Sequence, residues 1–240
     1  FFAFSTDNGQ TFSTPDNIGD TILLFGDPQI SSSGNNVYVV WVDTTPGNQE
    51  IFFAFSTDNG QTFSTPDNIS ENTGESEEPQ ISSSGNNVYL VWDDSTASIG
   101  DIFFAFSTDN GQTFSTPDNI SEDTVFTGSS DSPQISSEGN NVYVVWEFST
   151  DDEIYFAFST DNGQTFSTPD NISEDTVLSV RPQISSEGNN VYIVWMNDDG
   201  NLSLDIFFNS NNELFGLFGN NLNISHNPDD SEDPQISSSP

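Results

Sequence analysis

With 240 residues, the chain is long enough for one large all-β domain, and its core must be rich in aromatic rings, because it holds 22 Phe, 5 Tyr and 4 Trp. Its 38 Asp and Glu outnumber one Arg, one His and no Lys, and the net charge of −37 excludes nucleic acid and anionic membranes as partners. Cations, basic proteins and neutral glycans remain as possible partners. There is no Cys and no apolar run of the ~20 residues that a membrane-inserted helix needs.

An internal repeat of about 50 residues runs through the whole chain, a period typical of propellers and solenoids. The segment Phe-Phe-Ala-Phe-Ser-Thr-Asp-Asn-Gly-Gln-Thr-Phe-Ser-Thr-Pro-Asp-Asn-Ile occupies 1–18, 52–69 and 103–120, and it recurs at 155–172 with Tyr155 replacing the first Phe. A second segment, Pro-Gln-Ile-Ser-Ser, begins at Pro28, Pro79, Pro133, Pro182 and Pro234.

Each period predicts four short strands in the same order. The first is Pro-Gln-Ile-Ser-Ser, the second is Asn-Asn-Val-Tyr-Val-Val-Trp as at 35–41, the third lies at 51–55, and the fourth lies at 61–64. Both alternate faces of 37–41 are apolar, which indicates a sheet covered on both sides. Four such strands per period are typical of a propeller blade.

The chain is therefore predicted to be a single all-β domain over 1–240, a β-propeller of five four-stranded antiparallel blades. The third and fourth strands at the N-terminus should share a blade with the first strand at 234–238. Only four copies of the second strand are present. The fifth blade therefore needs a strand from beyond Pro240 or from a neighbouring subunit, and the latter would produce a polymer. Because the chain begins within a strand, it is expected to be a processed protein or a segment of a longer one.

A hairpin signal recurs between the third and fourth strands. Ser-Thr-Asp-Asn-Gly-Gln-Thr-Phe occupies 5–12, 56–63, 107–114 and 159–166, and its Asn-Gly tolerates the positive φ angles of a tight turn. In the fifth repeat, 207–215, the Asp and Gly are replaced, which predicts a degenerate closing blade with a different turn.

The hairpin motif resembles the Asp-box, or BNR repeat, of sialidases and related propellers. The resemblance implies a structural role in the outer hairpin of each blade, away from the active site, for Asp7, Gly9, Asp58, Gly60, Asp109, Gly111, Asp161 and Gly163. Calcium binding by these four Asp is the alternative, although one carboxylate per turn falls short of the ~6–8 oxygens that calcium takes. No cofactor is required on this interpretation.

Sialidases of this family bind the substrate carboxylate with three arginines and use a Tyr-Glu nucleophile pair with an Asp acid/base. The chain has only Arg181, so this arrangement cannot form and no catalytic residue is predicted. Near-identical blades also place one group repeatedly around a ring, whereas catalysis needs different groups at one point. The recurring glutamines should line the channel or bond between blades: Gln29, Gln80, Gln134, Gln183 and Gln235. His226, beside the acidic run 229–233, is interpreted as a solvated loop residue.

Most acidic residues lie in the loops between second and third strands and in the interblade connections. One face of the disc is therefore predicted to be anionic and to attract a cation or a basic partner. Five Asn-x-Ser sequons are candidate N-glycosylation sites and favour an extracellular or cell-surface location: Asn68, Asn119, Asn171, Asn201 and Asn223.

Together these features predict a non-enzymatic extracellular or cell-surface scaffold or adhesion module, whose repeated weak sites gain avidity. A calcium- or glycan-binding, lectin-like propeller is the alternative. A divergent glycan-active hydrolase ranks third.

Overall fold

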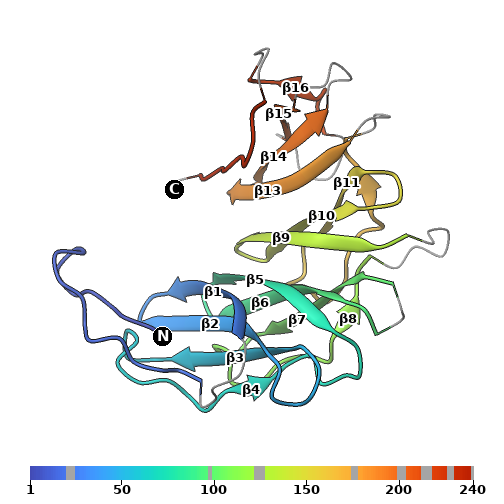
Figure 1. Cartoon of the computed structure of the whole chain (residues 1–240). Helices are drawn as coiled ribbons and strands as arrows, with labels where there is room; N and C mark the ends of the chain where they lie inside the picture. Colours follow the sequence, from blue (N-terminus) through green and yellow to red (C-terminus); the bar gives the residue numbers. More distant parts are fainter. Residues whose placement is uncertain are drawn as a thin grey trace.

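The computed structural model of the chain describes residues 1–19, 25–96, 99–121, 128–173, 178–198, 204–211, 218–225 and 230–238. These residues form four antiparallel sheets of four strands each, and every sheet keeps its strands in chain order (Figure 1). No helix occurs among them, and so none that is long and apolar enough to span a membrane. The predicted all-β class is confirmed.

The strands recur with nearly the same bounds in every sheet. The first strands are β1 (Phe25–Ser33), β5 (Ser76–Ser84), β9 (Ser130–Glu138) and β13 (Ser179–Glu187). The second strands are β2 (Asn36–Asp43), β6 (Asn87–Asp94), β10 (Asn141–Phe148) and β14 (Asn190–Asp198). The third strands are β3 (Glu50–Ser56), β7 (Asp101–Ser107), β11 (Glu153–Ser159) and β15 (Leu204–Asn211). The fourth strands are β4 (Asp67–Asn68), β8 (Asp118–Asn119), β12 (Asp170–Asn171) and β16 (Leu222–Asn223).

The fourth strand differs from the prediction. It was expected at 61–64, but β4 covers only Asp67–Asn68 and pairs with Phe52 and Phe53. The residues at 61–64 instead belong to the hairpin, because the backbone N–H of Thr62 donates to the Asp58 carboxylate at 2.9 Å. The hairpin therefore includes the segment that the alternating pattern assigned to a strand.

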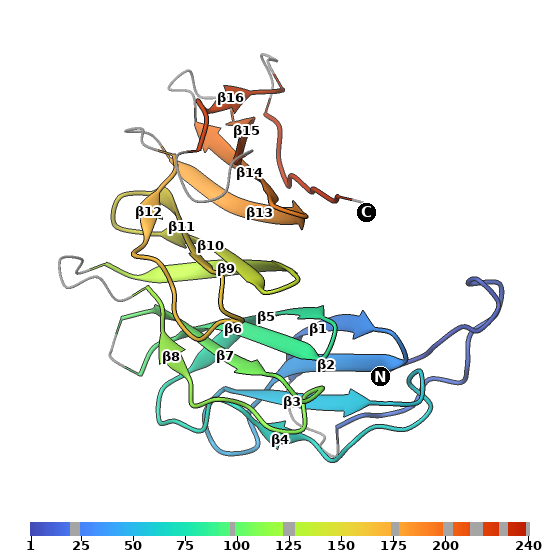
Figure 2. The same cartoon turned by 180° about the vertical axis from the view of Figure 1, so that it is seen from behind.

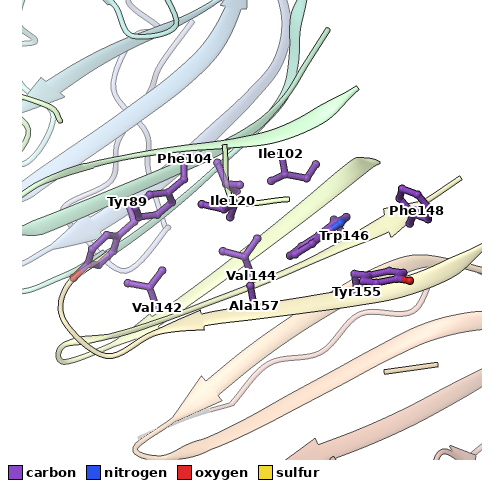
Figure 3. Close-up of a cluster of buried hydrophobic side chains, with 11 residues drawn as sticks. Tyr89, Ile102, Phe104, Ile120, Val142, Val144, Trp146, Phe148, Tyr155 and Ala157 are labelled. Carbon is purple, nitrogen blue, oxygen red and sulfur yellow. The ribbon is translucent and has the colours of Figure 1, made fainter. Parts of the chain in front are cut away.

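The sheets pack face to face, so the core consists of thin layers between neighbouring sheets (Figures 1 and 2). Figure 3 shows the layer between β5–β8 and β9–β12, where Phe104 and Ile102 face the side of β10 that carries Val144 and Trp146. Every residue from Val142 to Trp146 is buried, because successive side chains enter opposite layers. This explains why the second strands are apolar on both faces.

The four sheets form an arc that is not closed into a ring (Figure 1). The predicted fifth blade is represented by two segments only. At the N-terminus, Phe2 pairs with Asp16 in an isolated hairpin. At the C-terminus, Ser238 lies against β13, with its hydroxyl 2.8 Å from that of Ser185. The substituted turn predicted within 207–215 lies largely outside the described residues.

Candidate functional site

A β-bulge interrupts each first strand at the residue before the recurring proline. The pairing of β1 with β2 shifts between Gly26 and Gln29, and the other three sheets shift at the same place. The pre-proline residues all have φ between 50° and 54°, which is uncommon for residues other than glycine: Asp27, Glu78, Ser132, Arg181 and Asp233. A bulge of this kind redirects a side chain out of the strand's regular alternation.

These bulges surround a cavity of about 400 Å³, the channel pocket, where the first strands of neighbouring sheets meet. All five pre-proline residues and all five recurring glutamines line it, together with Glu147. The expectation that near-identical blades place the same group around the ring is therefore wrong at one position. The glutamines repeat, but the pre-proline residue is Asp, Glu, Ser, Arg or Asp. The bulge makes that position independent of the packing that keeps the rest of the repeat constant.

Acidic residues gather beside the bulges on only two of the sheets. In the middle sheets, Glu77 pairs with Asp93, and Asp131 pairs with Glu147, across the first two strands. In the flanking sheets the same pairs are Gly26 with Val42 and Val180 with Met196. Directly opposed residues of an antiparallel pair have Cβ atoms about 4.5–5.5 Å apart, so each middle sheet brings two carboxyl groups together.

The environment of this cluster favours protonated carboxyl groups. Burial, and then the charge of Asp131, raises the pKa of Asp93 to about 7. Burial is also the main reason that the pKa of Glu147 is raised to about 7. The pKa values of Glu78 and Asp131 are raised by desolvation as well, although the Glu78 side chain remains exposed towards the channel.

Asp93 lies behind the cluster rather than in the pocket lining. Its Oδ1 is buried without a hydrogen-bond partner. A Cβ atom at Gly100 would approach Oδ1 to 2.8 Å, so glycine is needed for this close approach. A buried, unpaired carboxylate oxygen is costly, and protonation of the group relieves that cost.

Glu147 and Glu78 line the pocket and share Ser132 as a neighbour. The backbone N–H of Ser132 donates to Glu78 Oε2 at 3.0 Å, and the Ser132 side chain also hydrogen-bonds to Glu147. The backbone N–H of Arg181 donates to Glu147 Oε1 at 2.6 Å. The Arg181 guanidinium forms an ion pair with Asp233, and both side chains are more than half exposed. The single arginine of the chain thus lies at this pocket.

The four Asp-box hairpins lie elsewhere, between third and fourth strands. In each turn, Ser donates to Oδ1 of the Asp at 2.7 Å, while the Thr four residues after the Asp donates its N–H and its hydroxyl: Asp7, Asp58, Asp109 and Asp161. Hydrogen bonds from Thr11 and Ser5 lower the pKa of Asp7 to about 2, and those from Ser56 and Thr62 do the same for Asp58. The φ angles of Gly9, Gly60, Gly111 and Gly163 are 80° to 82°.

These contacts support a structural role for the Asp-box and leave little room for calcium. The carboxylate oxygens of Asp58 already accept three hydrogen bonds within the turn. Across the described ranges, no group of three or more Asp, Glu or His side chains could hold a metal ion.

Four of the sequon asparagines lie in the two-residue fourth strands: Asn68, Asn119, Asn171 and Asn223. The Asn68 side chain accepts a hydrogen bond from the backbone of Glu71 at 3.2 Å, and Asn223 donates to Asp205 at 2.7 Å. The fifth sequon, Asn201, and the lone His226 lie outside the described residues.

Sequence reasoning missed the carboxyl cluster. Two signals could have found it. In repeats that are otherwise nearly identical, the residue before Pro-Gln-Ile changes in charge, and the residue after the second-strand Trp is Val42, Asp93, Glu147 or Met196. Charged residues that replace apolar ones at one fixed position of a repeat mark a site.

Several solved structures with a similar fold are enzymes that act on glycans. The intramolecular trans-sialidase from Ruminococcus gnavus has a TM-score of 0.61 at 10% identity, covering 85% of this chain and 71% of its own. The α-L-arabinanase from Penicillium chrysogenum has a TM-score of 0.57 at 16% identity, covering 86% and 68%. The GH62 α-L-arabinofuranosidase domain from Coprinopsis cinerea has a TM-score of 0.51 at 11% identity, covering 90% and 73%. No protein-family model and no curated protein sequence matches the chain.

These similarities correct the prediction of a non-enzymatic scaffold. These three structures with a similar fold are enzymes, so the repeat architecture gives no reason to exclude catalysis. The argument from the missing arginine triad excludes only one substrate-binding arrangement, and the argument from identical blades fails at the channel pocket. At these low identities the comparisons show the fold, and the chain has the fold of sialidase-like β-propellers.

Proposed function

We propose that the chain is a glycoside hydrolase that cleaves a neutral glycan in the channel pocket. The observation that carries this proposal is the pair Glu78 and Glu147, which line one pocket and contact the same residue, Ser132. Most glycoside hydrolases use two carboxyl groups that flank the scissile bond, about 5–9.5 Å apart. No other enzymatic reaction is supported by a comparable group of residues in the part of the chain that the structure describes.

Glu147 is suited to act as the general acid. Burial keeps it protonated up to a pH of about 7, and the Arg181 N–H fixes one of its oxygens at 2.6 Å. In this role Glu147 transfers its proton to the glycosidic oxygen as the bond to the anomeric carbon breaks. Besides burial, the like charges of Asp131 and Glu78 raise the pKa of Glu147.

Glu78 is suited to supply the second carboxyl group. It is the more exposed of the two and faces the channel from the neighbouring sheet. As a carboxylate it deprotonates the attacking water or attacks the anomeric carbon itself, depending on its separation from Glu147 when substrate is bound. Both routes require Glu147 to be protonated and Glu78 to be ionised at the start of the reaction.

The charge of the pocket favours a neutral substrate over a sialoside. Asp27, Glu78 and Asp233 line it, and the only arginine is already paired with Asp233. An anionic sugar would therefore meet repulsion rather than a binding clamp. A protein with a similar fold, the arabinanase, was solved with arabinobiose, a neutral sugar. An extracellular location fits a polymeric substrate and the sequons, and we include it in the proposal.

The proposal is tested by measuring hydrolysis of neutral aryl glycosides and of arabinan and galactan, with an aryl sialoside as the anionic comparison. We expect turnover of at least one neutral substrate. Replacing the general acid, Glu147→Gln, or its partner, Glu78→Gln, should lower kcat about 10²- to 10⁴-fold. The control Glu138→Gln alters an exposed carboxylate at the end of β9 and should leave the rate unchanged. Binding of neutral glycans without any turnover would contradict the proposal and favour a lectin-like function.

A further inference from the structure

Three of the four Asp-box hairpins pack against the repeat that precedes them in the chain. Phe114 of the hairpin 107–114 meets Phe53 of β3 edge to face, with ring centroids 4.8 Å apart, and Phe166 meets Phe104 of β7 in the same way at 4.8 Å. Phe63 meets Phe2 at 4.9 Å. The turn glycine takes part, since a Cβ atom at Gly111 would lie 2.7 Å from the Phe53 ring. The hairpin, here called the plug, thus packs on a third-strand Phe, here called the socket, and this contact recurs from repeat to repeat.

The N-terminal hairpin 5–12 is a plug without a socket in the described structure. Phe12 is 67% exposed, whereas the equivalent Phe63, Phe114 and Phe166 are half-buried. A Cβ atom at Gly9 would meet nothing within 4 Å, whereas Gly60, Gly111 and Gly163 are each covered by a phenylalanine ring.

The fourth sheet carries a socket without a plug. Phe208 of β15 pairs with Val194, the same register in which Phe53 pairs with Val40. Phe208 is half-buried, whereas its equivalents Phe53, Phe104 and Phe156 are only 2%, 1% and 5% exposed. Tyr192 on the adjacent strand is also half-buried, while Tyr38 and Tyr89 are fully buried. The face that a following hairpin covers elsewhere is uncovered here.

Polar contacts between the sheets point to the same register. The Asn36 side chain donates to Asn110 of the next hairpin at 2.9 Å, and Asn87 donates to Asn162 at 2.9 Å. The next step starts at Asn141 of β10, and its partner position falls outside the described residues. The step after that pairs Asn190 with Asn8.

The innermost strands add a ladder of serine hydroxyl pairs, which already extends to the C-terminal segment: Ser31–Ser83, Ser82–Ser137, Ser136–Ser186 and Ser185–Ser238. Its next step pairs Ser237 with Ser32 of β1.

We propose that the hairpin 5–12 docks on the exposed face of β14 and β15 of its own chain, with Phe12 against Phe208, and thereby closes the arc into a five-membered ring. The chain's own hairpin is the favoured occupant because both ends lie on the same open side of the arc in both views (Figures 1 and 2). A tethered partner also has a high effective concentration relative to a second copy. Closure would complete the wall of the channel pocket between Asp233 and Asp27. The inference does not depend on the catalytic role of Glu147.

Cross-linking tests the proposal directly, because the chain has no Cys. In Asn8→Cys/Asn190→Cys, a short bis-maleimide should link the two positions within one chain. Asn87→Cys/Asn162→Cys, whose asparagines are hydrogen-bonded in the structure, calibrates the yield. A link between two chains would show docking on a second copy and would overturn intramolecular closure. An absent link, with the calibrating pair reacting, would also overturn it.

Thermal unfolding provides a second measurement that needs no cysteine. If the ring closes, Phe12→Ala should lower the melting temperature by an amount comparable with Phe63→Ala, because both rings fill the same kind of socket. If the arc stays open, Phe12 is a solvent-exposed side chain and its replacement should have no effect, which would contradict the proposal.

Discussion

The two middle sheets, β5–β8 and β9–β12, and the two flanking sheets, β1–β4 and β13–β16, share strand order, register and core, yet differ beside the channel. Asp93 and Glu147 occupy the positions that Val42 and Met196 fill in the flanking sheets. Val42 and Met196 are each 3% exposed, and their burial costs no desolvation of a charge. The acidic pair has strongly raised pKa values, about 7. Acids kept in an environment that disfavours their charge are a mark of function rather than of folding.

The largest expected effect of this difference is on the pH dependence of catalysis. Because the pKa of Glu147 is raised to about 7, the group donates a proton below that pH and loses it above. We expect kcat/KM for a neutral glycan to fall about tenfold per pH unit above 7. A pH–rate profile measures this. A rate that stays constant to pH 9 would contradict the assignment of Glu147 as the acid.

The next largest effect is on stability. It is expected when Asp93 of the sheet β5–β8 is replaced by Val, the residue at the equivalent position of β1–β4. Asp93 has a folded-state pKa of about 7 against an ordinary value of 3.8, so the folded state loses stability as pH rises from about 4 to 7. Asp93→Val should therefore raise the free energy of unfolding at pH 8 by roughly 1–3 kcal/mol, and by less at pH 5. Urea unfolding at both pH values measures the difference.

The control is Asp118→Val, which alters an exposed carboxylate of the same blade. An equal gain from Asp93→Val at pH 5 and pH 8 would mean that packing, not charge, distinguishes the two kinds of sheet.

A smaller effect is expected where all the blades agree. Asp109→Ala removes hydrogen bonds from the Ser107 hydroxyl and from the N–H and hydroxyl of Thr113. We expect a loss of about 1–2 kcal/mol of stability with no direct effect on the channel pocket. Calorimetry measures the unfolding of Asp109→Ala, with Asp118→Ala as the control. A loss of activity without a loss of stability would place the hairpin in the site after all.

The smallest effect concerns the net charge of −37, which all the blades share. Raising ionic strength from about 10 mM to 1 M shortens the Debye length from about 30 Å to 3 Å and weakens repulsion among the acidic side chains. We expect a gain of roughly 1 kcal/mol, or about 2–4 °C in Tm for a chain of this size. Calcium at matched ionic strength serves as the comparison. A Tm insensitive to salt would refute the repulsion argument.

Much of the fold could be predicted from sequence because it depends on the repeat. The second strand predicted at 35–41 and the third at 51–55 agree with β2 (Asn36–Asp43) and β3 (Glu50–Ser56). The fourth strand was misplaced because the Asp58 carboxylate binds the backbone of the segment that alternation assigned to β structure. Local hydrogen bonding from a side chain competed successfully with the strand pattern.

The candidate site could not be predicted, for a different reason. The residue before a proline is expected to be extended, which would leave Glu78 in the regular alternation of β5. Its φ of 50° reverses the local backbone and gives the side chain access to the channel. Sequence shows that this position varies, but the direction in which the side chain points depends on a bulge that no local propensity favours.

The five pre-proline bulges also have a consequence for protein engineering. Each one separates the side chain at the channel from the strand that carries it, and Asp, Glu, Ser and Arg all occupy the position with φ angles within 4° of one another. The backbone there is accordingly tolerant of side-chain chemistry, in the way that an antibody framework tolerates its variable loops. A combinatorial library randomised at Asp27, Ser132, Arg181 and Asp233, with Glu78 kept for its proposed catalytic role, should yield mostly folded members, with the selectivity of the pocket as the property that varies.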